Sequence, residues 1–132
     1  MLRLVAKGAK LRCADGATPC TLKVMRVDYL VDGHAIANVE DHKPAINIDG
    51  FGMCKCMQNP AVAAATAANK GALTPMPCKP PSFSEWTPGA KYIYQDVDGR
   101  NVSALTNECT CSCAYGPTVE IVDPATDLNV EA

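Results

Sequence analysis

The sequence of 132 residues predicts a mainly β protein, and two features of the chain support this prediction. Short stretches in which apolar and polar residues alternate are typical of strands that bury one face. They occur at residues 21–31, 34–39, 91–94, 101–105 and 118–122. Asp-Gly pairs favour tight turns, because glycine tolerates a positive φ and aspartate bonds back to the backbone. These pairs lie at 15–16, 32–33, 49–50 and 98–99.

One segment predicts a helix, at residues 60–70. Asn59 is a candidate N-cap and Pro60 stands at the first helical position, where a missing N–H does no harm. Alanine then dominates, Lys70 lies in the last turn, and Gly71 is a C-terminal stop. Because the apolar side chains are small, we expect this helix to lie close against a sheet.

The composition excludes two classes of protein. The net charge of −2 offers no basic patch, which disfavours nucleic acid as a partner. No apolar run approaches the roughly 20 residues that a membrane helix needs. We expect one domain over residues 1–122, followed by a short and mildly acidic C-terminal tail at 123–132.

The N-terminal segment lacks the continuous apolar core of a secretory signal. We therefore expect the chain to be made in the cytosol, where thiols stay reduced. In that compartment, eight cysteines indicate metal ligands rather than disulfides.

The eight cysteines form four clusters along the chain. These clusters are Cys13 and Cys20, then Cys54 and Cys56, then Cys78, then Cys109, Cys111 and Cys113. Cysteines two apart on a strand point the same way, with Cα atoms about 6.5 Å apart, so they do not bond to one another. Four segments that each supply one thiolate would make the tetrahedral site that zinc prefers.

Other interpretations of the cysteines stay open. They include disulfides formed after export, buried free thiols that act as small hydrophobes, and a catalytic pair of Cys54 with His42. His42 is either an exposed loop residue or a ligand that replaces one thiolate. The single tryptophan, Trp86, is expected in the core.

A weak internal repeat is present. Residues 31–41 resemble residues 97–108 if one extra residue is allowed. Each copy contains a strand end, an Asp-Gly turn and a second strand. Such hairpins can also arise independently in any β protein.

Several longer words of the sequence, read together, carry a resemblance to a known family. They are GAKLRC (8–13), DHKPAINIDGFGMC (41–54), NPAVAAATAANKGALTPMPCKP (59–80), EWTPG (85–89) and CAYGPTVEI (113–121). In these words, the chain resembles the PAAR-like proteins, once catalogued as a family of unknown function. They look like relatives of the PAAR proteins, small β-rich cones that cap the trimeric spike of type VI secretion and related contractile injection systems.

The resemblance implies a cone of β-hairpins with pseudo-threefold symmetry and a metal, usually zinc, at its tip. The cysteines that fall within the shared words are the expected ligands: Cys13, Cys54, Cys78 and Cys113, with His42 as an alternative ligand. The remaining cysteines would form a second metal site or disulfides: Cys20, Cys56, Cys109 and Cys111. The third hairpin would come from the segment between Cys54 and Trp86 or from the N-terminal strand.

The function implied by the resemblance is structural. The chain would sit on a trimeric VgrG-like spike protein, one cap per trimer, and sharpen it for membrane puncture. It could also link effector cargo. It would be made in the bacterial cytoplasm and delivered outside the cell or into a target cell. The resemblance implies no catalysis by the chain and no stable insertion into a membrane. The alternatives are a cysteine-dependent enzyme or redox protein that uses Cys54 and His42, and a secreted domain stapled by disulfides.

Overall fold

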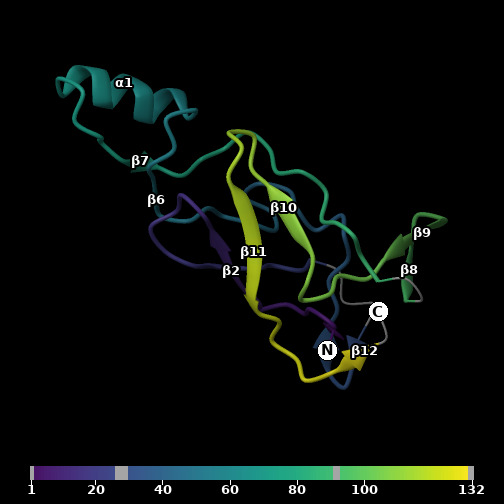
Figure 1. Ribbon diagram of the computed structural model, residues 1–132. Helices are drawn as coiled ribbons and strands as arrows, with labels where there is room; N and C mark the ends of the chain where they lie inside the picture. The colour runs from purple at the N-terminus through teal and green to yellow at the C-terminus, as the bar shows by residue number, and fades with distance from the viewer. Residues whose placement is uncertain (1, 26–29, 91–92, 131–132) are drawn as a thin grey trace.

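The computed structural model describes residues 2–25, 30–90 and 93–130, and in these ranges the protein is mainly β with one short helix (Figure 1). The predicted fold class is therefore confirmed. The first strands are β1 (Leu2–Arg3), β2 (Lys10–Cys13), β3 (Cys20–Thr21), β4 (Leu30–Val31), β5 (His34–Ala35) and β6 (Met53–Cys54). Helix α1 (Pro60–Ala68) follows, and then β7 (Met76–Pro77), β8 (Tyr94–Val97), β9 (Arg100–Ser103), β10 (Thr110–Ser112), β11 (Thr118–Asp123) and β12 (Asn129–Val130).

The largest sheet has four antiparallel strands in the order β10-β11-β2-β3. Its strands alternate as the sequence predicts: in β2, Leu11 and Cys13 are buried, whereas Lys10 and Arg12 are exposed. Arg12 pairs with Glu120 of the neighbouring strand on the solvent face. The buried face packs into the main core, where Trp86 is fully buried and donates its indole N–H to the carbonyl of Asp41 at 3.0 Å. The prediction that Trp86 lies in the core is confirmed.

Three segments that are distant in sequence form a closed ring of backbone hydrogen bonds. The backbone N–H of Val5 donates to the carbonyl of Leu105 (3.0 Å), that of Leu105 to Ala37 (3.0 Å), and that of Ala37 to Val5 (2.8 Å). All three side chains are fully buried. The flanking residues pair in the same cyclic order, through the bridges Leu4–Thr106, Ala6–Ile36 and Asn38–Ala104. A single chain thus presents a threefold arrangement of backbone.

A second set of hydrogen bonds repeats the threefold pattern just outside the ring. The backbone N–H groups of Lys7, Val39 and Asn107 donate to the carbonyls of Ala35, Ser103 and Arg3, at 2.9, 3.0 and 3.0 Å. Each segment of the ring follows a strand, namely β1, β5 or β9, that is paired in a hairpin-like ladder. The partners of these strands are β12, β4 and β8.

Two of the three ladders contain the repeated sequence, and the third joins the two ends of the chain. Asp-Gly turns at 32–33 and 98–99 connect β4 to β5 and β8 to β9, with positive φ at both residues of each turn. In the ladder of β1 and β12, Leu2 pairs with Val130 and Arg3 with Asn129. The N-terminal strand therefore supplies the third copy. The cyclic order of the bridges makes Ile36 and Ala104 equivalent positions. Between the glycine of its turn and this position, the second copy has two residues more than the first, whereas the sequence comparison allowed for one.

Helix α1 begins where the sequence predicts and ends two residues earlier. The Asn59 side chain accepts from the backbone N–H of Ala61 at 3.0 Å, as an N-cap does. The chain then leaves the helix through Asn69, and Lys70 and Gly71 follow with φ of 56° and 88°. No helix in the described ranges is long and apolar enough to cross a membrane.

The helix lies at one end of the molecule, and β12 with the N-terminus lies at the opposite end (Figure 1). The buried residues of α1 are Val62 and Thr66, and the helix packs on β7 of the two-stranded β6–β7 sheet. The expectation that its alanines lie against a sheet is therefore corrected. The anchor is Val62, while Ala65 is only half-buried.

The predicted strand at 21–31 is not continuous. Strand β3 ends at Thr21, and Leu22 still donates in register to Ala9, just before β2 (2.8 Å). The chain then leaves this partner, because the N–H of Lys23 donates to the carbonyl of Asn47 (2.9 Å). Residues 26–29 of this prediction, and residues 91–92 of the predicted strand 91–94, lie outside the described residues.

Candidate functional site

The four cysteines of the shared words come from four segments and converge at the end of the molecule that carries α1. Cys13 ends β2 and Cys54 ends β6, both as buried members of an alternating strand pattern. Cys78 follows β7, and Cys113 follows β10 in a bridge with Phe83. Cys13, Cys54 and Cys113 are buried, and Cys78 is partly exposed.

The thiols lie close enough to influence one another's ionisation. The pKa of Cys13 is raised to about 11, mainly by burial and to a smaller extent by the neighbouring thiols of Cys113 and Cys78. Burial also raises the pKa of Cys78, again with contributions from Cys54 and Cys113. The pKa of Cys113 is raised by burial first and by Cys54 among its neighbours. The four thiols therefore lie within electrostatic reach of their neighbours in this set, and their role as metal ligands stays a prediction.

Close backbone contacts hold this end together and explain two of its glycines. The backbone N–H of Cys78 donates to the carbonyl of Gly52 at 2.7 Å. A Cβ on Gly50 would lie 2.5 Å from the carbonyl oxygen of Cys78, and a Cβ on Gly16 would lie 2.4 Å from the Cβ of Phe51. Any larger residue at either position would push these segments, and the cysteines on them, apart.

The donor chemistry of this cluster suits a thiophilic metal ion, because thiolates are preferred ligands of zinc. Across residues 2–25, 30–90 and 93–130, however, no three His, Cys, Asp or Glu side chains stand in a group that could hold a metal ion. The thiols are therefore neighbours, but in the described ranges they do not form a group ready to hold a metal ion.

Of the other four cysteines, three lie within electrostatic reach of the first set, namely Cys20, Cys56 and Cys111, whereas Cys109 has different surroundings. Cys109 is fully buried, and its sulfur accepts from the backbone N–H groups of Gly89 (3.3 Å) and Thr106 (3.4 Å). The Thr106 hydroxyl is also 3.3 Å from it. This sulfur acts as a hydrogen-bond acceptor, a role that no sequence spacing indicates.

Cys20, Cys56 and Cys111 are buried within apolar clusters. The Cys56 thiol donates to the carbonyl of Tyr115 at 3.6 Å, and the Cys20 thiol to that of Thr21 at 3.7 Å. Burial raises the pKa of Cys111 to about 12, with the thiols of Cys113 and Cys13 adding to the effect. All eight cysteines are free thiols in the structure.

His42 lies in a loop on a different part of the surface. Its backbone N–H donates to the carbonyl of Glu40 at 2.9 Å. Glu40, Asp41 and Lys43 line a hollow of about 520 Å³ together with Arg100. Cys54, by contrast, packs with Cys56 and Val62 beside the helix.

The opposite end of the molecule carries an apolar surface beside two of the three ladders. Leu30 and Tyr94, at 58% and 53% exposure, occupy equivalent positions in two of the ladders, and Val31 is 40% exposed. Together with Leu4 and Ile36 they line a hollow of about 240 Å³. The signal for this surface was the internal repeat, since repeated hairpins place repeated side chains on one face.

One comparison with known proteins identifies a family over most of the chain. A family model described as "Domain of unknown function (DUF4280)" matches residues 5–125. Neither a curated protein nor a solved structure matches the chain.

Proposed function

The chain belongs to the family described as "Domain of unknown function (DUF4280)", and on this premise we propose that it is a structural tip protein that caps the trimeric spike of a contractile injection system. It would act without catalysis, as one cap on three identical spike chains. The observation that carries this proposal is the closed ring of hydrogen bonds among Val5, Ala37 and Leu105. One chain can match a threefold partner only if it repeats its own backbone three times, and this ring does so.

The apolar surface beside two of the ladders supports the proposal. Large exposed apolar side chains that gather on one face mark surfaces that bind another protein. Leu30, Val31 and Tyr94 gather at the end where the three ladders lie. With a net charge of −2, the chain has little electrostatic steering, so contact through apolar and backbone groups should survive moderate salt.

The opposite end would form the point that meets the target membrane. A narrow point has too little volume for a large core, and small scaffolds compensate with metal ions or crosslinks. We propose zinc as a structural metal here, held by Cys13, Cys54, Cys78 and Cys113. Bound zinc would hold together the four segments that supply these thiolates, and small zinc domains gain roughly 10–16 kcal/mol from such binding.

Stoichiometry tests the cap directly. The protein is mixed with the trimeric spike protein encoded beside it, and the mass of the complex is measured. We expect one copy of this chain per three spike chains. A ratio of three to three, or no complex with a neighbouring spike, would contradict the proposal.

A pair of matched variants tests the surface. Leu30→Asp places a charge on the apolar surface and should weaken spike binding by at least about tenfold, since it desolvates a charge in the contact. Leu73→Asp, at a residue of similar exposure (53%) next to the helix end, should bind like the wild type. Equal binding by the two variants would show that this face is not the contact.

A further inference from the structure

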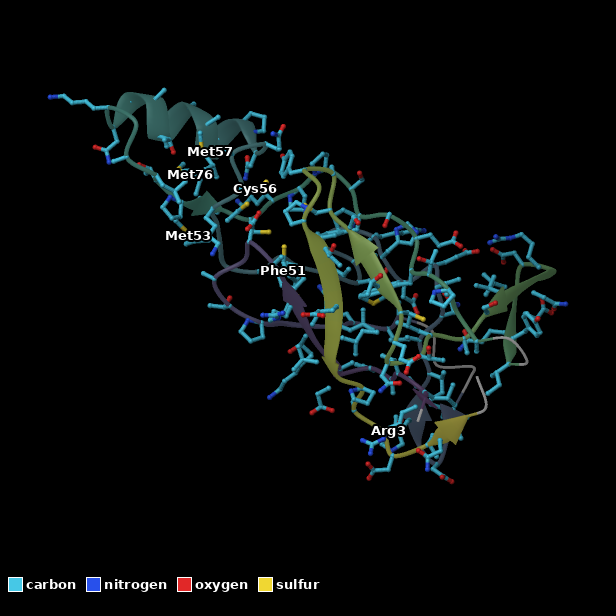
Figure 2. All side chains as sticks on the ribbon, viewed as in Figure 1. Arg3, Phe51, Met53, Cys56, Met57 and Met76 are labelled. Atoms are coloured by element: carbon cyan, nitrogen blue, oxygen red, sulfur yellow. The ribbon has the colours of Figure 1, made fainter. Side chains whose placement is uncertain are left out.

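A small cluster of sulfur-bearing side chains joins α1 to the β6–β7 sheet. Its buried members are Cys54, Cys56 and Val62, against which Met76, Cys78 and Tyr115 pack. We refer to Cys54, Cys56, Met76 and Cys78 as the sulfur cluster. Figure 2 shows Cys56 and Met76 at this end of the molecule, together with Met53 and Met57, far from Arg3 at the opposite end.

Two thiols and one thioether of the cluster are held near one another by the local backbone. Cys54 pairs directly with Met76 across the β6–β7 ladder. Side chains that are paired in this way have Cβ atoms about 4.5–5.5 Å apart. The backbone N–H of Cys56 donates to the sulfur of Cys54 at 3.4 Å, which folds the chain back so that Cys56 joins the same cluster.

This donor set differs in kind from the four cysteines proposed for zinc. Zinc takes thiolate, imidazole and carboxylate ligands, whereas a combination of thiolates with a thioether selects the softer Cu(I) ion. Cys56 and Met76 have no part in the four-cysteine set.

The methionines around the cluster give a second, independent indication. Of the five methionines in the chain, three lie here: Met53, Met57 and Met76. Met53 and Met57 are 44% and 51% exposed, and each is adjacent in sequence to a cysteine of the cluster. Two exposed thioethers, close in sequence to buried thiols, thus add soft donors at this end of the molecule.

We propose that Cys54, Cys56 and Met76 bind Cu(I). On binding, the two thiols each release a proton to solvent and the resulting thiolates and the thioether donate to the ion, which keeps its oxidation state. Because Cys54 also belongs to the proposed zinc set, the two metals compete for it. This site does not depend on the spike proposal.

Titration under anaerobic conditions tests the site. The reduced, metal-free full-length chain is titrated with Cu(I) alone against a chromophoric Cu(I) chelator, and ultraviolet absorption from thiolate to Cu(I) is recorded. We expect one bound Cu(I). Met76→Leu should weaken its affinity at least about 10-fold, because the loss of a ligand costs no less than the loss of a residue that only orients one. Cys56→Ser should weaken it at least as much.

Met25→Leu is the matched control, since Met25 is 58% exposed and lines the separate hollow near Arg100. Its Cu(I) affinity should equal that of the wild type. Leucine in place of Met76 conserves volume, so Met76→Leu gives a folded variant even where Cys56→Ser does not. Equal affinities for Met76→Leu and Met25→Leu, or no Cu(I) binding by the wild type, would overturn the site.

A parallel zinc titration separates the two metal proposals. Met76→Leu should leave zinc binding unchanged while it weakens Cu(I) binding, which supports the Cu(I) site. Cu(I) binding that depends on Met76 in a chain that binds no zinc would also support the Cu(I) site and would contradict the zinc proposal alone.

Discussion

In each of the three ring segments, one equivalent buried backbone N–H finds a hydrogen-bond acceptor, and the acceptor differs from segment to segment. The backbone N–H of Asn38 donates to the carboxylate of Asp41 at 2.9 Å, and that of Thr106 donates to the sulfur of Cys109. At the third position the corresponding residue is Ala9, which has no acceptor, and the N–H of Ala6 donates to the carbonyl of Pro124 at 3.1 Å instead. Each buried donor is satisfied, as the energetics of unpaired polar groups require.

Replacement of Cys109 tests this role. Cys109→Val removes the acceptor for the N–H groups of Thr106 and Gly89, and each buried donor left unpaired costs about 1–3 kcal/mol. We expect a clear fall in the free energy of unfolding, measured by urea denaturation. Cys109→Ser keeps an acceptor and should be less destabilised. If valine were tolerated better than serine, packing rather than hydrogen bonding would explain the residue.

Replacement of Cys78 tests the proposed zinc ligands. Cys78→Ser removes one of four thiolates, so the variant should contain less zinc by elemental analysis and melt at a lower temperature. Cys109→Ser is the control, because Cys109 is occupied by other hydrogen bonds and should leave the zinc content unchanged. Zinc content and melting temperature equal to those of the wild type in Cys78→Ser would rule out this ligand.

At the scale of elements, each hairpin and the helix follow local rules. The turns at 32–33 and 98–99 adopt positive φ at both residues, which matches the right-handed twist of the flanking strands. The helix has a strong N-cap and a left-handed exit, but only Val62 and Thr66 are buried. Its attachment therefore depends on a few side chains and on the sulfur cluster below it.

Truncation of Val62 measures that attachment. Val62→Ala removes two buried methyl groups and should lower the free energy of unfolding by about 1–3 kcal/mol. Val122→Ala, at a residue that is 61% exposed, should change it by no more than about 0.5 kcal/mol. Proteolysis in the 69–75 segment should also increase in Val62→Ala, and an unchanged cleavage rate would show that the helix is held by other contacts.

At the scale of the whole molecule, the ring joins segments from the beginning, the middle and the end of the described chain. Val5, Ala37 and Leu105 meet at its centre, and β12 returns to pair with β1. Such distant pairings lose loop-closure entropy before they gain hydrogen bonds, so the ring should form and melt together with the core around it.

Truncation at the centre of the ring tests this cooperativity. Leu105→Ala leaves a cavity among three buried side chains and should destabilise the protein by about 2–5 kcal/mol, in one transition seen by every probe. Leu73→Ala, at an exposed residue, should be close to neutral. A separate early transition in Leu105→Ala would indicate that the two ends of the molecule fold independently.

Local patterns in the sequence were sufficient to predict the β class, the start of the helix at Pro60 and two of the three repeats. Each of these depends on neighbours within a few residues: alternation along a strand, the Asn59 cap, and the Asp-Gly turns. The resemblance selected four cysteines as metal ligands, and this assignment stays a prediction, because neither spacing nor burial distinguishes them from the neighbouring thiols of Cys20, Cys56 and Cys111.

Only the tertiary structure decided the third repeat, the role of Cys109 and the sulfur cluster. The segment of β1 has no Asp-Gly turn, and its partner β12 lies at the other end of the chain, so no local pattern links Leu2 with Val130. Likewise, the acceptor role of Cys109 depends on the N–H of Gly89, twenty residues earlier in the sequence. Periodicity in the sequence predicts which face of an element is buried. The segment that packs on that face is determined by hydrogen bonds and packing between distant segments, and these contacts form only when the ring closes.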